Sequence, residues 1–124
     1  MFLPPSVDRV RREPVWDAFQ MIWMDTDVDA ELPRIVNAAA TSCYSIADLH
    51  HIYWHEVRPV VWKNMLIPVA PEWAGYEIKW LGDKIIERLA SGKKSLPIKF
   101  HRYARGYWAK IESGVRIARE NLDP

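Results

Sequence analysis

The apolar residues of this chain recur at helical spacing almost from end to end, and this periodicity constrains the fold more than any other feature. Val15, Phe19 and Ile22 are spaced four and three residues apart, which places them on one face of a helix. Residues 76–92 repeat the pattern. No segment alternates with the period of two that a half-buried strand requires. We therefore predict an all-α fold.

Proline, glycine and capping residues divide the chain into separate helices. The predicted helical segments are residues 14–24, 30–42, 45–57, 60–67, 76–92 and 97–122. Residues 1–13 are predicted to form an extended arm, and Pro59 to kink or interrupt the helix before it. Residues 1–124 have the usual length of one domain. We expect an all-α, single-domain bundle of five or six helices.

The charges are divided unevenly along the chain, although the formal net charge is only +1. Residues 1–62 carry 5 Lys and Arg against 9 Asp and Glu, a balance of −4, and residues 63–124 carry 12 against 7, a balance of +5. These halves can neutralise each other or form two distinct surfaces. Of the seven tryptophans, we expect most in the core and one or two as partly exposed interface anchors.

Cysteine usage and hydropathy favour a soluble cytoplasmic protein. Cys43 is the only cysteine, so no internal disulfide can form. The N-terminal residues contain no long apolar run typical of a signal peptide. No segment approaches the roughly 18 uncharged apolar residues that a membrane span requires. No membrane partner is expected.

The stretch WMDTDVDAEL, residues 23–32, carries acids at alternate positions. They are Asp25, Asp27, Asp29 and Glu31. Three of them match the opening of a helix–loop–helix calcium loop, but that loop also needs a glycine at its sixth position and a glutamate at its twelfth. Ala30 and Val36 occupy these positions, which excludes the calcium loop.

Two interpretations of the acidic stretch remain. In the first, it is a polar joint in which Asp27 or Asp29 caps the second helix and Glu31 favours its positive N-terminus. In the second, the acids form a docking surface for a basic protein partner, with Trp23 or Trp73 as an aromatic anchor.

His51 and His55 lie four residues apart in a predicted helix, with Glu56 adjacent, and this spacing allows two histidines to share a zinc ion. The metalloprotease pattern H-E-x-x-H is absent, because Val57, Arg58 and Pro59 follow the glutamate. No nucleophile motif or phosphate-binding glycine loop is present either. We expect no catalytic residues, metal or cofactor, and keep a metal-dependent enzyme as an alternative.

The last helix interleaves basic and aromatic residues, a pattern compatible with nucleic-acid binding. Its aromatic residues, however, fall on one stripe that favours contact with the core. The near-neutral chain also lacks the basic excess typical of such domains. A nucleic-acid-binding regulator is therefore a second alternative, and a homodimer built on this helix a third.

Three segments together resemble a family of small bacterial all-helical proteins without an assigned activity. In that family, a Trp–Ala helix ends in Asp-Thr, a later helix carries Glu-Val-x-Pro followed by an asparagine, and a Glu-Trp-x-Gly loop leads into a helix with Trp-Leu. The matching residues are Trp16, Ala18, Asp25, Thr26, Glu56, Val57, Pro59, Asn64, Glu72, Trp73, Gly75, Trp80 and Leu81. The resemblance covers residues 14–90 and leaves the last helix outside.

This resemblance implies an immunity or antitoxin protein, which neutralises a bacterial toxin by binding it. Such a partner is often basic, and acids could then occupy its active surface. The expected partner-binding residues are Asp25, Asp27, Asp29, Glu31, Trp23 and Trp73.

Overall fold

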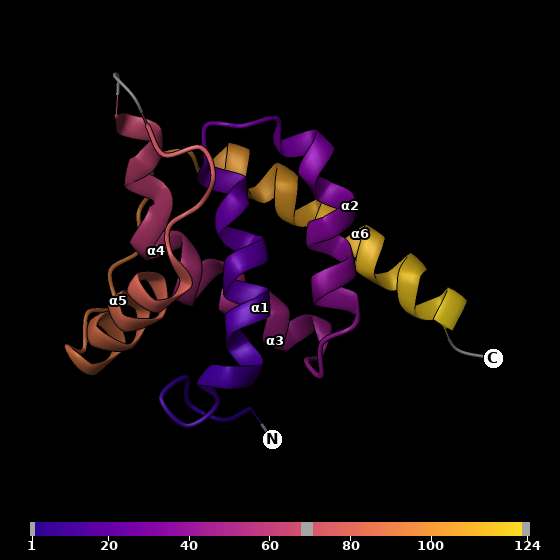
Figure 1. Cartoon of the computed structure of the whole chain (residues 1–124), viewed down its shortest axis with the longest axis horizontal. Helices are drawn as coiled ribbons and strands as arrows, with labels where there is room; N and C mark the ends of the chain where they lie inside the picture. The colour runs from indigo at the N-terminus through magenta and orange to yellow at the C-terminus, as the bar shows by residue number, and fades with distance from the viewer. Residues whose placement is uncertain (1, 68–70, 123–124) are drawn as a thin grey trace.

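The described part of the chain folds into helices (Figure 1). The computed structural model describes residues 2–67 and 71–122, so both chain ends and the first residues of the predicted loop after residue 67 lie outside it. Its α-helices are α1 (Arg9–Gln20), α2 (Val28–Ala40), α3 (Ile46–His51), α4 (Arg58–Val61), α5 (Ile78–Ala90) and α6 (His101–Leu122). Shorter helical turns are η1 (Met21–Trp23), η2 (Ile52–Val57) and η3 (Trp62–Leu66). With no strand among these residues, the predicted all-α bundle is confirmed.

The first helix begins earlier than the sequence predicts. Because α1 starts at Arg9, the expectation of an extended arm is wrong for residues 9–13. Pro14 lies inside this helix and removes the amide that would reach the carbonyl of Val10. Since Val10 is 84 % exposed, solvent can hydrate that carbonyl. The extra helical turn also carries Arg12 into the protein interior, where its side chain is closed to solvent.

The chain is helical without a break from α3 through η3, so of the kink or interruption predicted at Pro59, the interruption does not occur. η2 is a π-helical turn, whose hydrogen bonds span one residue more than those of an α-helix. Pro59 follows it as the second residue of α4. The wider turn directs Glu56 toward α1 and Trp54 toward the start of α6.

The core lies where α1 and α2 meet the π-helical turn and α6 (Figure 1). Phe19 and Tyr53 are fully buried there, with ring centroids 5.6 Å apart. α6 approaches α2 closely at Gly114, where an added Cβ would lie 2.8 Å from Cγ2 of Val36. Among the described residues, no helix combines the length and the apolar character needed to cross a membrane.

Candidate functional site

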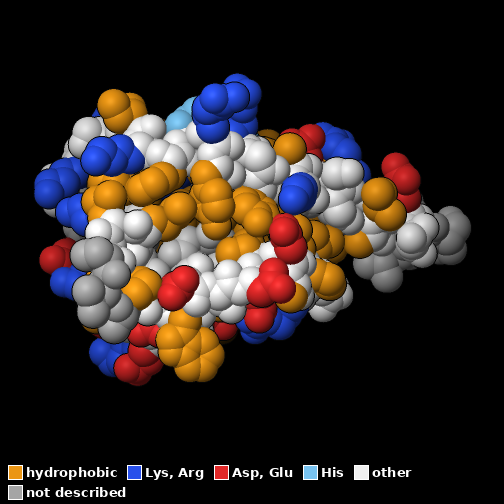
Figure 2. Space-filling model, turned by 90° about the horizontal axis from the view of Figure 1, so that it is seen from above, with side chains coloured by type: hydrophobic (Ala, Val, Ile, Leu, Met, Phe, Trp, Pro, Cys, Tyr) orange, Lys and Arg blue, Asp and Glu red, His pale blue; other side chains and the backbone are white. Residues whose placement is uncertain are grey.

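The acidic stretch joins η1 to α2 at one end of the bundle (Figure 1, top). The face seen from that end carries acidic side chains beside hydrophobic ones (Figure 2). Asp27 caps α2, because its carboxylate accepts a hydrogen bond from the amide of Ala30 at 3.3 Å. Glu31 pairs with Arg34, one turn further along the same helix, at 2.7 Å. These two acids therefore have roles within the fold.

Asp29 connects α2 to the last helix. Its Oδ1 accepts hydrogen bonds from the Tyr107 hydroxyl at 3.0 Å and from Lys110 Nζ at 3.3 Å. The hydrogen bond from Tyr107, followed by that from Lys110, lowers the pKa of Asp29 below its usual value. The acidic and basic halves of the chain thus neutralise each other at this point. Asp25 has an exposed side chain without a hydrogen-bond partner in the described part of the chain.

Of the two tryptophans expected as anchors, one is buried and the other is exposed. Trp23 is 1 % exposed and packs against Tyr53, with ring centroids 5.0 Å apart. This corrects the expectation for Trp23, since a side chain enclosed by the core offers no contact to a partner. Trp73 is 65 % exposed, on the loop that precedes α5.

Two buried amide side chains hold the Trp73 loop. Asn64 donates to the carbonyl of Glu72 at 2.8 Å and accepts from its amide at 2.9 Å. Gln20 pairs in the same way with Tyr76, donating to its carbonyl at 3.0 Å and accepting from its amide at 2.8 Å. Side chains thus replace the backbone partners of a strand pairing.

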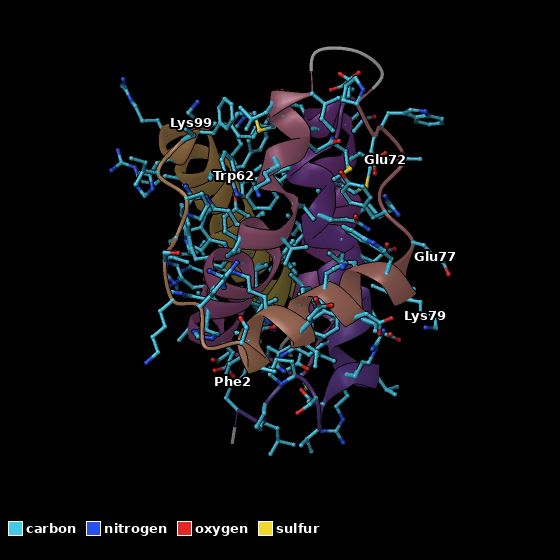
Figure 3. All side chains as sticks on the ribbon, turned by 90° about the vertical axis from the view of Figure 1, so that its left-hand side faces the viewer. Phe2, Trp62, Glu72, Glu77, Lys79 and Lys99 are labelled. Carbon is cyan, nitrogen blue, oxygen red and sulfur yellow. The ribbon has the colours of Figure 1, made fainter. Side chains whose placement is uncertain are left out.

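Gly75 completes this loop, and its backbone has a φ of +95°, which an L side chain rarely adopts. A Cβ there would also lie 3.1 Å from Nε2 of Gln20. The loop is tied to the acidic stretch, because the amide of Asp25 donates to the carbonyl of Glu72 at 2.9 Å. The structure therefore brings Asp25 and the residues around Trp73 to the same end of the molecule (Figure 3, near Glu72).

The histidines and Glu56 do not form the metal site that the sequence left as an alternative. His51 and His55 stack on each other, with ring centroids 4.8 Å apart. Glu56 faces α1 instead, where its Oε1 accepts from Trp16 Nε1 at 2.9 Å and lies 3.5 Å from Nε of Arg12. Across the residues described, no group of three or more His, Cys, Asp or Glu side chains is placed to hold a metal ion.

Burial of Glu56 raises the pKa of its carboxyl, and the Trp16 hydrogen bond and the charge of Arg12 oppose that rise. Arg12 also donates to the carbonyl of Leu3 at 2.7 Å and lies 4.3 Å from the ring centroid of Phe2. This buried pair therefore joins the N-terminal residues, α1 and the π-helical turn. Because the Glu56 carboxylate is buried and bonded within the protein, we assign the Arg12–Glu56 pair a structural role.

The basic residues of α6 divide into two groups. In the second half, Lys110 pairs with Asp29, and Arg119 donates to backbone carbonyls at the end of α2 and in the turn after it. In the first turns, Arg102 and Arg105 are exposed, and the described residues include no ion pair to either. The basic surface is smaller than the sequence indicates, and nucleic-acid binding stays an alternative prediction.

A pocket that the sequence does not predict lies between the π-helical turn and the start of α6. Its volume is about 470 Å³. The lining residues are His50, Trp54, His55, Arg58, Leu96, Pro97, Ile98, His101, Arg105 and Trp108. The only signal in the sequence is the spacing of four residues between Trp54 and Arg58. This spacing shows that the two side chains lie on one side of a helix, but it does not show which other segment packs against them.

The fold and these surfaces define a small all-α protein with a clamped aromatic loop at one end and a histidine- and arginine-lined pocket on one side. The chain belongs to a family defined by a domain of unknown function, DUF7079, whose model matches residues 10–114. The segments that carry the resemblance noted in the sequence fall inside this match. No curated protein and no solved structure shows significant similarity to the chain.

Proposed function

We propose that this protein is a non-enzymatic binding module, and that the Trp73 loop and the acids beside it engage a protein partner. The observation that carries the proposal is a tryptophan 65 % exposed on a loop whose backbone is held by Asn64 and Gln20. Tryptophan is enriched among the residues that dominate binding energy. A loop fixed before binding loses little conformational entropy when a partner docks.

Further apolar side chains surround the same clamp. The amide of Ile67, which is 43 % exposed, donates to the Asn64 carbonyl. The hydroxyl of Tyr76 donates to Oδ1 of Asn64, and the ring of Tyr76 lies 4.7 Å from that of Trp80, which is 41 % exposed. An exposed aromatic residue with apolar neighbours is typical of the centre of an interface.

The charge of this end indicates the kind of partner. The carboxylate of Asp25 has no hydrogen-bond partner among the described residues, and its backbone amide donates to the carbonyl of Glu72. The Glu72 carboxylate accepts from the amides of Trp73 and Ala74 and so lies beside the anchor. Carboxylates around an aromatic anchor complement a basic surface. A toxin that acts on nucleic acid or nucleotides has such a surface, so we propose a bacterial immunity or antitoxin role, exercised in the cytoplasm.

The test is binding between this purified protein and the purified product of the neighbouring gene, measured by calorimetry. Trp73→Ala should weaken the complex about tenfold or more, as expected for an anchor residue. Asp25→Asn should weaken it at low salt more than at high salt, because exposed charges are screened. The control is Val10→Ala, which truncates an exposed apolar residue on α1.

Equal loss of affinity in Trp73→Ala and Val10→Ala would contradict the role of the loop. Failure of the neighbouring gene product to bind, together with no protection of cells from its toxicity, would overturn the immunity role.

A further inference from the structure

The pocket between the π-helical turn and α6 contains a buried cation without a counter-charge. Arg58 is 2 % exposed, and no Asp or Glu of the described chain lies within 4.0 Å of its guanidinium. Among the described residues, the guanidinium makes one hydrogen bond, a long one of 3.4 Å from Nη2 to the carbonyl of Lys99, and its Nε has no partner. Isolating a charge from water without an opposite charge is unfavourable.

The side chains around Arg58 add N–H donors and positive charge, and none of them is a carboxylate. Trp54, whose ring lies 4.8 Å from the Arg58 guanidinium carbon, has a buried indole N–H without a partner in the described structure. Arg105 lies at the exposed side of the pocket, and no acidic residue is among the lining residues. A pocket that offers N–H donors and positive charge, but no carboxylate, is complementary to an anion.

The walls of the pocket are largely apolar and aromatic. The ring of His101 lies 5.2 Å from that of Trp54, and the ring of His50 lies 5.3 Å from that of Trp108. Leu96, Pro97 and Ile98 line another side. At about 470 Å³, the volume falls within the range of small-molecule sites.

We infer that this pocket binds a small organic carboxylate with a flat, apolar body, whose carboxylate pairs with Arg58 and whose body lies between the aromatic walls. A single buried guanidinium matches one negative charge and can bind a carboxylate through two parallel hydrogen bonds. A phosphate dianion would need more donors than one buried arginine supplies to replace its hydration. The inference is independent of the Trp73 loop, which lies on the other side of the α4–η3 segment (Figure 3, compare Lys99 with Glu72).

The test uses indole-3-acetate as the probe, indole-3-acetamide as its neutral counterpart, and inorganic phosphate. Calorimetry should show saturable binding of the carboxylate, weaker binding of the amide by at least about tenfold, and no binding of phosphate at about 5 mM. The indole N–H resonance of Trp54, assigned with a Trp54→Phe variant, should shift with the carboxylate. The whole chain is used throughout.

Two exposed arginines of α6 provide a matched pair of variants. Arg105→Gln removes a pocket charge and should weaken carboxylate binding, whereas Arg102→Gln, three residues earlier and outside the lining, should leave it unchanged. Arg58→Gln should abolish the preference for carboxylate over amide. Because a buried arginine can matter for folding, the Arg105 and Arg102 pair decides the question if Arg58→Gln does not fold.

Three results would each overturn the inference. The first is equal affinity for the carboxylate and the amide, which would make the pocket a neutral apolar cavity. The second is phosphate binding as tight as that of the carboxylate, which would show an anion site of another class. The third is no binding of indole-3-acetate at about 5 mM, well above the range of specific ligands.

Discussion

The side-chain amide of Asn64 binds both backbone groups of Glu72, donating to its carbonyl at 2.8 Å and accepting from its amide at 2.9 Å. The same Nδ2 donates to the carbonyl of Trp23 at 3.0 Å. Asn64 is 2 % exposed, so solvent cannot replace these bonds. One buried side chain therefore fixes the loop that presents Trp73 relative to η1, the turn that follows α1.

We expect Asn64→Asp to destabilise the protein by about 2–4 kcal/mol, because a carboxylate cannot donate to the two carbonyls and would place a negative charge in the interior. Asn64→Ala should destabilise it less, since it leaves no buried charge. The control is Asn37→Ala, at an exposed position of α2. Urea unfolding measures the free energies, and a loss in Asn64→Asp no greater than in the control would refute the role of this clamp.

The buried pair of Arg12 and Glu56 should show strong coupling. Glu56→Ala leaves Arg12 buried without its carboxylate, and we expect a loss of about 3–5 kcal/mol. The double variant Arg12→Met with Glu56→Leu should be less destabilised than Glu56→Ala, because it removes both charges and fills their space. A double-mutant cycle of Arg12→Met, Glu56→Leu and their double variant, measured by urea unfolding, gives this coupling. Additive effects of these two single changes would show that the pair does not interact.

The stacked histidines predict a pH dependence of stability. Burial lowers the pKa of both His51 and His55, and the charge of His55 lowers that of His51 further. A histidine with a lowered pKa in the folded state binds more protons when unfolded, so acid favours unfolding. We expect full stability above about pH 6.5, the ordinary histidine pKa, and a progressive loss below it.

The measurement compares urea unfolding at about pH 7.5 and pH 5.5 for the protein and for a His51→Gln, His55→Gln double variant. The variant should lose less stability on acidification. Burial raises the pKa of Glu56, which acts in the opposite direction, but Glu56 is present in both proteins and cancels in the difference. Equal losses in the two proteins would exclude the histidines as the cause.

Two glycines of α6 should respond to alanine in opposite directions. At Gly114 an added Cβ would lie 2.8 Å from Cγ2 of Val36, and we expect a loss of about 1–3 kcal/mol from overpacking. At Gly106 nothing lies within 4 Å of such a Cβ. The better helix propensity of alanine should therefore raise the free energy of unfolding by about 0.5–1 kcal/mol. Thermal unfolding compares the two, and Val36→Ala should partly rescue Gly114→Ala. A stabilised Gly114→Ala would mean that the helices separate without penalty.

The local features of this protein could be predicted from its sequence because they depend on residues a few positions apart. The spacing of Val15, Phe19 and Ile22 predicted a helix, and all three side chains are buried. The cap by Asp27 was one of two alternatives, and the hydrogen bond from Ala30 selects it. The start of α1 was mispredicted, because burial of Arg12 against Glu56, 44 positions away, is not visible in local spacing.

The candidate sites depended on contacts between distant segments. Exposure separates Trp73 from Trp23, because side chains distant in the sequence, such as Tyr53, pack against Trp23 and enclose it in the core. The pocket arises because residues near Lys99 approach the π-helical turn, which brings a carbonyl but no carboxylate to Arg58. Helical periodicity therefore determined the fold class and the buried faces, since it is a local property of the chain. Only the tertiary structure decided which polar groups found partners, because those partners come from segments that are far apart in the sequence.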